Sequence, residues 1–189
     1  MKKRVGIMGG TFDPIHLAHL IMANEAYHAL ELDEVRFLPN ATPPHKMISG
    51  QSSAEDRCRM IEASTADIPY FKLDKSEILR DGKSYSYDTI SQFVEQEPDT
   101  DFFFIIGGDM IASLSTWYRI DELKKIITFV GFSRPGYNVG NDEVLMINGP
   151  VVDLSSTILR KRLAEKQDCR FLIPEQAYRY ILEEGLYES

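Results

Sequence analysis

The sequence has few cysteines, no excess of positive charge and no long apolar run. Its two cysteines, Cys58 and Cys169, are far apart along the 189 residues and lack the spacing of metal ligands. We therefore expect them to be small, partly buried apolar residues in a reducing compartment. The formal net charge of -8 disfavours a bulk nucleic-acid binder, which is usually basic. With this charge, an anionic substrate requires a locally basic pocket.

No apolar run approaches the length that crosses a membrane. The basic start, Met1 to Arg4, is followed by an apolar run that breaks at Gly9-Gly10 and is too short for a signal-peptide core. These features favour a cytoplasmic enzyme or binding protein. The hydrophobic content of 43% is ordinary for a globular protein, and the length suits one domain, residues 1–189, with a substantial core.

Apolar runs alternate with segments of helical spacing. Strands are expected at Val5–Met8, Val35–Leu38, Tyr70–Leu73, Phe102–Ile106 and Ile126–Phe132. Helices are expected at Leu17–Leu30, Ser53–Ser64, Tyr87–Glu95, Ile158–Glu165 and Pro174–Glu183. This alternation predicts an α/β fold, a Rossmann-like parallel sheet with helices on both faces and a small C-terminal helical segment. Ligands bind such sheets beyond the carboxyl ends of the strands, where the strand order reverses.

Local signals divide these elements. The stretch Ser52-Ser53-Ala54-Glu55 fits a capping box and predicts a helix start. The segment from Pro39 to Gln51 is rich in Pro, Ser and Gly, so a loop is expected there. The polar stretch Gly136–Asp142 is typical of a surface loop.

One stretch carries most of the chemical information: Gly9-Gly10-Thr11-Phe12-Asp13-Pro14-Ile15-His16-Leu17-Ala18-His19. A glycine-rich turn from a strand to a helix exposes backbone N–H groups to which a phosphate can bind. His16 and His19 share one face of the first helical turn, where the dipole is positive, and can donate to phosphoryl oxygens. Two alternatives are a pair that merely caps or packs and a zinc site, for which the chain offers only His28 and His45 as further histidines and no nearby cysteine cluster.

The turn itself offers further phosphate contacts. The Thr11 hydroxyl can bind a phosphate, while Gly9 and Gly10 allow close backbone approach. The alternative for the two glycines is a plain tight turn. Asp13 is expected to shape the turn through an Asx hydrogen bond, outside the site.

A second anion site is predicted at Ser155-Ser156-Thr157, where a helix begins, with Arg160 one turn further on the same face. The alternative is an ordinary N-cap with a solvated arginine. Arg134, just past an apolar strand, and Lys46, on the proline-rich loop, are additional phosphate candidates.

Two further residues are candidates for ligand binding. Asp109 follows a buried strand and can accept a hydrogen bond from a ribose hydroxyl, or can cap a helix over Met110–Leu114. Trp117, the sole tryptophan, can stack on a flat ring or be a half-buried packing residue.

Four separated segments resemble one family. The stretch from Gly9 to His19 is similar to the G-G-T-F-D-P-x-H-x-G-H signature of the HxGH nucleotidyltransferase superfamily. The other segments are Pro43-Pro44-His45-Lys46, then Ile105-Ile106-Gly107-Gly108-Asp109 with Trp117-Tyr118 downstream, and Ser155 to Arg160. In this order, and with Ser133 to Gly136, the set resembles the bacterial nicotinate mononucleotide adenylyltransferases over essentially the whole chain. Ala18 departs from the Gly of the signature, and Gly108 from the Ala more usual in the family.

The resemblance implies that ATP and nicotinate mononucleotide give deamido-NAD and pyrophosphate, in NAD biosynthesis. The monophosphate attacks the α-phosphorus of ATP and is already anionic, so no protein base is required. Catalysis then depends on alignment and on charge stabilisation by His16 and His19, with His19 as the stronger of the two. Magnesium is implied as a cofactor carried with ATP, so no dedicated protein metal site is expected.

The residues discussed above and the resemblance together give the expected binding residues. For ATP they are Gly9, Gly10, Thr11, His16, His19, Asp109, Ser155, Ser156, Thr157 and Arg160. For the mononucleotide they are His45, Lys46, Ser86, Trp117, Tyr118 and Arg134. Trp117 would stack on the pyridine ring, and backbone N–H groups near Ser86 and Tyr118 would bind the nicotinate carboxylate. An amide in place of that carboxylate would leave donors facing a donor, at about 1–3 kcal/mol for each unpaired group.

Two other functions stay open from the sequence. A pantetheine-phosphate adenylyltransferase shares the first motif but does not need Pro43 to Lys46 or the Trp117-Tyr118 pair. A non-catalytic nucleotide sensor with this fold would tolerate loss of His16 or His19, and both are present. The expected partners are small-molecule substrates, without nucleic acid or membrane, and a homo-oligomer is left open.

Overall fold

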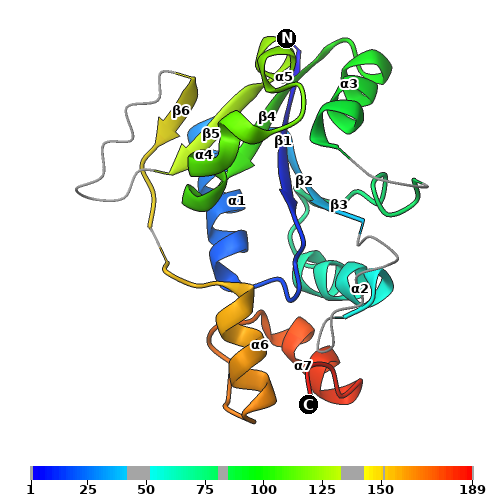
Figure 1. Cartoon of the computed structure of the whole chain (residues 1–189), viewed down its shortest axis with the longest axis vertical. Helices are drawn as coiled ribbons and strands as arrows, with labels where there is room; N and C mark the ends of the chain where they lie inside the picture. The colour runs from blue at the N-terminus through cyan, green and yellow to red at the C-terminus, as the bar shows by residue number, and fades with distance from the viewer. Residues whose placement is uncertain (1, 42–51, 81–84, 133–142, 151, 189) are drawn as a thin grey trace.

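The computed structural model describes residues 2–41, 52–80, 85–132, 143–150 and 152–188, and within these ranges the chain forms a six-stranded sheet (Figure 1). The strands are β1 (Lys3–Gly10), β2 (Glu34–Pro39), β3 (Phe71–Leu73), β4 (Thr100–Ile106), β5 (Thr128–Phe132) and β6 (Val144–Ile147). Their order is β3-β2-β1-β4-β5-β6, and every neighbouring pair is parallel. The predicted α/β fold is therefore confirmed, and the strand order reverses between β1 and β4.

Helices cover both faces of the sheet. They are α1 (Leu17–Ala29), α2 (Ala54–Thr65), α3 (Ser86–Gln96), α4 (Gly108–Ser113), the 3-10 turn η1 (Leu114–Thr116), α5 (Ile120–Ile126), α6 (Ser156–Ala164) and α7 (Glu175–Glu183). Alternate residues of β4 enter opposite cores: Phe103 belongs to the cluster that includes α1 and α7 residues, and Phe104 to the cluster that includes α3 and α5 residues. Because both faces are buried, β4 reads as a continuous apolar run rather than an alternating one.

Several expected boundaries need correction. The strand expected at Ile126–Phe132 begins at Thr128, because α5 continues through Ile126. The helix expected at Ile158–Glu165 begins at Ser156. β6 was not expected from the sequence. The expected loops lie largely outside the described residues, at 42–51 and 136–142.

The start of α2 is also shifted by one residue from the expected capping box. Ser53, rather than Ser52, is the N-cap: its hydroxyl accepts a hydrogen bond from the Asp56 backbone N–H at 3.1 Å. Asp56 in turn accepts from the Ser53 backbone N–H at 3.0 Å, so it takes the place expected for Glu55. Ser52 is thereby available for a different contact.

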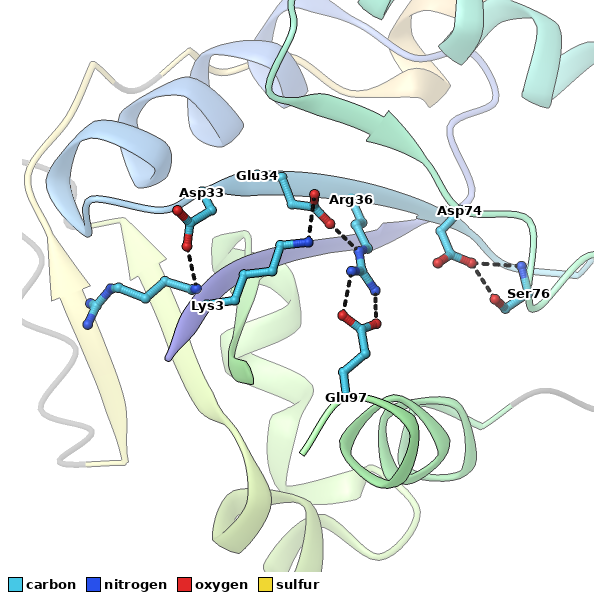
Figure 2. Close-up of polar contacts among 8 residues, drawn as sticks. Lys3, Asp33, Glu34, Arg36, Asp74, Ser76 and Glu97 are labelled. Atoms are coloured by element: carbon cyan, nitrogen blue, oxygen red, sulfur yellow. Dashed lines mark hydrogen bonds and ion pairs between the residues drawn. The ribbon is translucent and has the colours of Figure 1, made fainter. Parts of the chain in front are cut away.

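The amino ends of β1 and β2 carry a network of charged side chains (Figure 2). Arg36 on β2 donates to both carboxylate oxygens of Glu97, just past α3, at 2.5 and 2.8 Å. Arg36 also donates to Glu34 at 2.7 Å, and Lys3 pairs with Glu34 at 3.0 Å. The hydrogen bonds from Arg36 lower the pKa of Glu97. This network holds the sheet and α3 together at the end opposite to the glycine turn.

No helix within the described ranges is long and apolar enough to cross a membrane. Figure 1 shows α6 and α7 beyond the end of the sheet to which β1 points, so the C-terminal helical segment lies near the turn after β1.

Candidate active site

The glycines at the end of β1 are required by close packing. A Cβ atom on Gly9 would lie 2.8 Å from Cζ of Phe104, and one on Gly10 would lie 3.2 Å from Cζ of Phe12. Neither glycine has a positive φ, so the alternative of a plain tight turn does not explain them. The left-handed conformation falls instead on Phe12, with φ of 53°, a strained angle for a buried residue with a side chain.

The two predicted catalytic histidines lie side by side at the start of α1. His16 is the N-cap residue, and its imidazole stacks on that of His19 with ring centroids 3.7 Å apart and planes 19° apart. The backbone N–H of His16 donates to Nδ1 of His19 at 3.2 Å. Because Nδ1 of His19 accepts this bond, the proton of the neutral ring is on Nε2, which can donate to a ligand.

Burial keeps both imidazoles neutral near pH 7. His16 is 4% exposed, and burial lowers its pKa to about 4. The pKa of His19 also falls well below its ordinary value, first because of burial and then because of the neighbouring His16. In the described part of the chain, Nδ1 of His16 has no hydrogen-bond partner. The geometry therefore favours neutral N–H donors over imidazolium ions.

The backbone N–H groups at this helix start are less available than the sequence implied. The N–H of Leu17 donates to the carbonyl of Leu172 at 3.0 Å, and that of His19 donates to the carbonyl of His16 at 3.0 Å. The imidazoles, more than these two amides, can face a phosphate. Ala18, at the position of the signature glycine, is 6% exposed in an ordinary helical turn.

The turn rests on a buried arginine that sequence reasoning missed. Arg57 on α2 is fully buried, and its Nη1 donates to the carbonyls of Thr11 at 2.8 Å and Asn40 at 2.9 Å. These bonds join the segment after β1 to the segment after β2. In the sequence, Arg57 stands among charged helix residues, and nothing there indicates that it points inward.

The predicted second anion site at α6 faces the same turn. Ser155 is the N-cap, and its Oγ accepts from the Ile158 backbone N–H at 3.4 Å. Oγ of Ser156 donates to the Pro14 carbonyl at 2.9 Å, and Nη1 of Arg160 donates to the Asp13 carbonyl at 2.7 Å. Nη2 of Arg160 also lies 3.4 Å from Oγ1 of Thr157. The structure thus brings Ser155, Ser156, Thr157 and Arg160 beside the turn that carries His16.

A cavity of about 170 Å³ opens beside the end of β1. Two predicted mononucleotide residues, Ser86 and Trp117, line it, and so do both glycines; the other lining residues are Leu38, Asn40, Glu77, Phe104 and Met110. The Trp117 ring packs edge-on against Phe104, with centroids 5.7 Å apart. Tyr118 is not among the lining residues; it is half exposed, with its ring 4.6 Å from that of Tyr85.

Ser86 is the first residue of α3. Its N-cap residue, Tyr85, makes no side-chain capping bond, while the N–H groups of Asp88 and Thr89 donate to the Tyr85 carbonyl. The positive end of a helix of eleven residues is thus beside the cavity. This arrangement can bind a carboxylate.

Glu77 is the one ionisable side chain among the described lining residues, and it was not predicted. It is 5% exposed, and its Oε1 accepts from Oγ1 of Thr89 at 3.1 Å. Burial raises its pKa. Its polar sequence surroundings give no signal that this glutamate, more than its neighbours, faces a cavity.

Four predicted residues need separate mention. His45, Lys46 and Arg134 lie outside the described residues. Asp109 is the second residue of α4, and the N-cap of that helix is Gly107, so the alternative in which Asp109 caps the helix is wrong. Within the described ranges, no group of three or more His, Cys, Asp or Glu side chains could hold a metal ion.

Comparison with known proteins agrees with this geometry. Residues 7–162 match the cytidylyltransferase-like family, so the parallel sheet whose strand order reverses beside glycines and an imidazole pair belongs here to a nucleotidyltransferase. A probable nicotinate-nucleotide adenylyltransferase of Bacillus cytotoxicus is 50% identical over 188 residues, 99% of this chain and 100% of the relative. One of Lactiplantibacillus plantarum is 47% identical over 99% of this chain and 89% of the relative. The chain belongs to the nicotinate-nucleotide adenylyltransferases.

Solved structures share the fold. The nicotinic acid mononucleotide adenylyltransferase of Plasmodium falciparum complexed with NaAD has a TM-score of 0.82 at 20% identity, with 98% of each chain covered. The same enzyme complexed with APC has a TM-score of 0.80 at 20% identity and the same coverage.

Proposed function

We propose that this protein transfers AMP from ATP to nicotinate mononucleotide, giving deamido-NAD and pyrophosphate. A phosphate oxygen of the mononucleotide forms a bond to the α-phosphorus of ATP as the bond from that phosphorus to the bridging oxygen of pyrophosphate breaks. The observation that carries the proposal is the cavity lined by Gly9, Gly10, Ser86 and Trp117 at the point where the strand order reverses. The names of the 46–50% identical relatives support the same substrate.

In this proposal the imidazoles stabilise charge on the transferring phosphoryl group. Nε2–H of His19 donates to an oxygen on the α-phosphorus, and the neutral His16 supports it by stacking and through its backbone N–H. A neutral donor suits the step because the attacking phosphate needs no base. The α6 start, from Ser155 to Arg160, is proposed to bind the triphosphate while the bonds of Ser156 and Arg160 to the turn remain in place.

We propose that the cavity binds the nicotinate ring. Trp117 stacks on the ring, the backbone N–H of Ser86 donates to its carboxylate, and Tyr118 closes the mouth beside Tyr85. Glu77 lines the same cavity, so its carboxyl group would lie close to the nicotinate carboxylate. Its raised pKa reduces the repulsion between the two carboxyl groups.

Magnesium bound to the ATP phosphates would supply charge neutralisation there. We propose that residues 1–189 form one catalytic domain, since α6 contacts the turn after β1. A cytoplasmic location accords with the two buried free thiols.

Pyrophosphate release from ATP in magnesium buffer tests the substrate. Nicotinate mononucleotide, nicotinamide mononucleotide and phosphopantetheine are offered in turn. We expect a strong preference for the first. Equal rates with the amide analogue would contradict the carboxylate site, turnover with phosphopantetheine alone would favour the pantetheine-phosphate enzyme, and no turnover with any would favour a nucleotide sensor.

A backbone substitution tests the carboxylate site directly. Ser86→Pro removes one N–H at the first helical position, where proline is tolerated, and the extended backbone of Tyr85, with φ of -106° and ψ of 139°, suits a residue before proline. Loss of a hydrogen bond to a carboxylate, about 1.5–3 kcal/mol, should raise KM for nicotinate mononucleotide about 10- to 100-fold. Ser86→Ala keeps the N–H and should leave KM near the wild-type value. Equal effects of the two substitutions would refute the assignment.

A further inference from the structure

The phosphate turn holds a buried carboxylate whose partners come from distant parts of the chain. Asp13 is 1% exposed, and its Oδ1 accepts from the Tyr187 hydroxyl at 2.7 Å, the Ser52 hydroxyl at 2.5 Å and the Ser52 backbone N–H at 3.1 Å. These donors lie 174 and 39 residues away in sequence. The expected Asx turn at Asp13 is therefore replaced by long-range hydrogen bonds.

Tyr187 keeps the proton of its hydroxyl group and so remains a hydrogen-bond donor in this network. It is 7% exposed, and burial together with the charge of Asp13 raises the pKa of its hydroxyl well above the ordinary value. The hydroxyl thus stays protonated at any pH at which the enzyme is assayed. Its contact with Asp13 is a charge-assisted hydrogen bond, the stronger kind.

The backbone of the same turn is held by the same C-terminal part of the chain. The carbonyls of Asp13 and Pro14 accept from Arg160 and Ser156, and the N–H of Leu17 donates to the Leu172 carbonyl. The anchored residues belong to the segment that runs from Gly10, which lines the cavity, past His16 to the start of α1. The anchors therefore set the distance between the cavity and the imidazole pair.

We propose that Tyr187 is a positioning residue of the transfer reaction: its hydroxyl, together with Ser52, fixes Asp13 and so places His16 and His19 against the cavity. Tyr187 is not among the described residues that line the cavity; its hydroxyl contacts Asp13 and, at 3.1 Å, the Ser52 hydroxyl that also binds Asp13, so it acts on the site through Asp13. The inference rests on the proposed function, because the reaction supplies its readout. Substrates should still bind when the bond is lost, but the reacting groups should be misaligned.

The same C-terminal segment provides a matched control. The Tyr180 hydroxyl donates to Oδ1 of Asp56 at 2.8 Å, again a tyrosine-to-aspartate bond, but at the start of α2 rather than at the phosphate turn. Tyr187→Phe and Tyr180→Phe each remove one hydroxyl and one such bond. Tyr187→Phe removes a hydrogen bond to Asp13, whereas Tyr180→Phe removes one to Asp56.

The experiment measures the single-turnover rate of AMP transfer by rapid quench, KM for both substrates, and the melting temperature. Tyr187→Phe should lower the transfer rate about 10- to 100-fold, the range expected for a misplacement of the order of 1 Å, with each KM changed by less than about 3-fold. Tyr180→Phe should keep the wild-type rate, although both variants should melt at a lower temperature. Equal rates for the two variants would overturn the inference, as would a loss seen in KM alone.

Two more variants keep the test decisive if Tyr187→Phe folds poorly. Ser52→Ala removes the other hydroxyl donor to Asp13 and should lower the rate in the same direction. Asp13→Ala removes the acceptor, so Asp13→Ala combined with Tyr187→Phe should be no slower than Asp13→Ala alone, because Tyr187 acts through Asp13. An additive loss would contradict this, whereas wild-type protein without transfer to nicotinate mononucleotide would refute the proposed function instead.

Discussion

Acid should destabilise this protein in a way that traces to the imidazole pair. In the unfolded chain His16 takes up a proton near its ordinary pKa of 6.5, but in the folded protein it does so only near pH 4. The unfolded state therefore binds more protons between these values, and stability is lost as pH falls through this window. From pH 7.5 to pH 5.0 the loss from His16 alone is about 2 kcal/mol at 25 °C, and His19 adds to it in the same direction.

Urea unfolding followed by circular dichroism at several pH values measures this loss. Between pH 7.5 and pH 5.0, the His16→Gln protein should lose about 2 kcal/mol less of its free energy of unfolding than the wild type loses. His28→Gln, at an exposed histidine of the same helix, is the control for the loss of a histidine away from the site. Glu77, with its raised pKa, opposes the trend in every variant and cancels in the comparison. A His16→Gln protein with the full wild-type pH dependence would refute the reasoning.

Further substitutions test the packing and the ion pairs. Gly9→Ala should lower the free energy of unfolding by about 1–3 kcal/mol, because its Cβ would lie 2.8 Å from an aromatic ring of β4. Gly108→Ala should instead raise it by about 0.5–1 kcal/mol, since a Cβ there meets nothing within 4 Å and the residue lies in a helix. Glu97→Gln should cost about 1–3 kcal/mol through its two bonds to Arg36. Glu175→Gln, in an exposed helical pair, should cost less than about 0.5 kcal/mol. Thermal and urea unfolding check all four, and equal costs for the last two would contradict the account.

The sheet and the turn after β1 could be predicted because their signals are local. Phe102 to Ile106 is an apolar run that ends at Gly107, and the glycine turn directly precedes the histidines. β6 could not be predicted because it has only four residues and one of them, Leu145, is 45% exposed, so the segment has no clear burial pattern.

The support beneath the site could not be predicted, because it depends on side chains that meet only after folding. Nothing local distinguishes Arg57 from the other charged residues of α2, or assigns Ser52 to Asp13 rather than to the helix cap. Ser52 and Ser53 are adjacent, and so are Glu55 and Asp56, so a local rule accepts a capping box at either position. Tyr187 meets Asp13 across 174 residues, a pairing that no spacing rule reaches.

The central claim is that the imidazole pair acts at the phosphorus centre at which AMP is transferred, with His19 in contact with it and His16 supporting His19. A crystal structure of this chain with deamido-NAD bound tests it most directly. We predict Nε2 of His19 within about 2.7–3.2 Å of a phosphate oxygen of the dinucleotide, with the nicotinate ring against Trp117. A complex in which the dinucleotide binds away from both imidazoles, with no ring nitrogen in hydrogen-bond range of a phosphate, would contradict it.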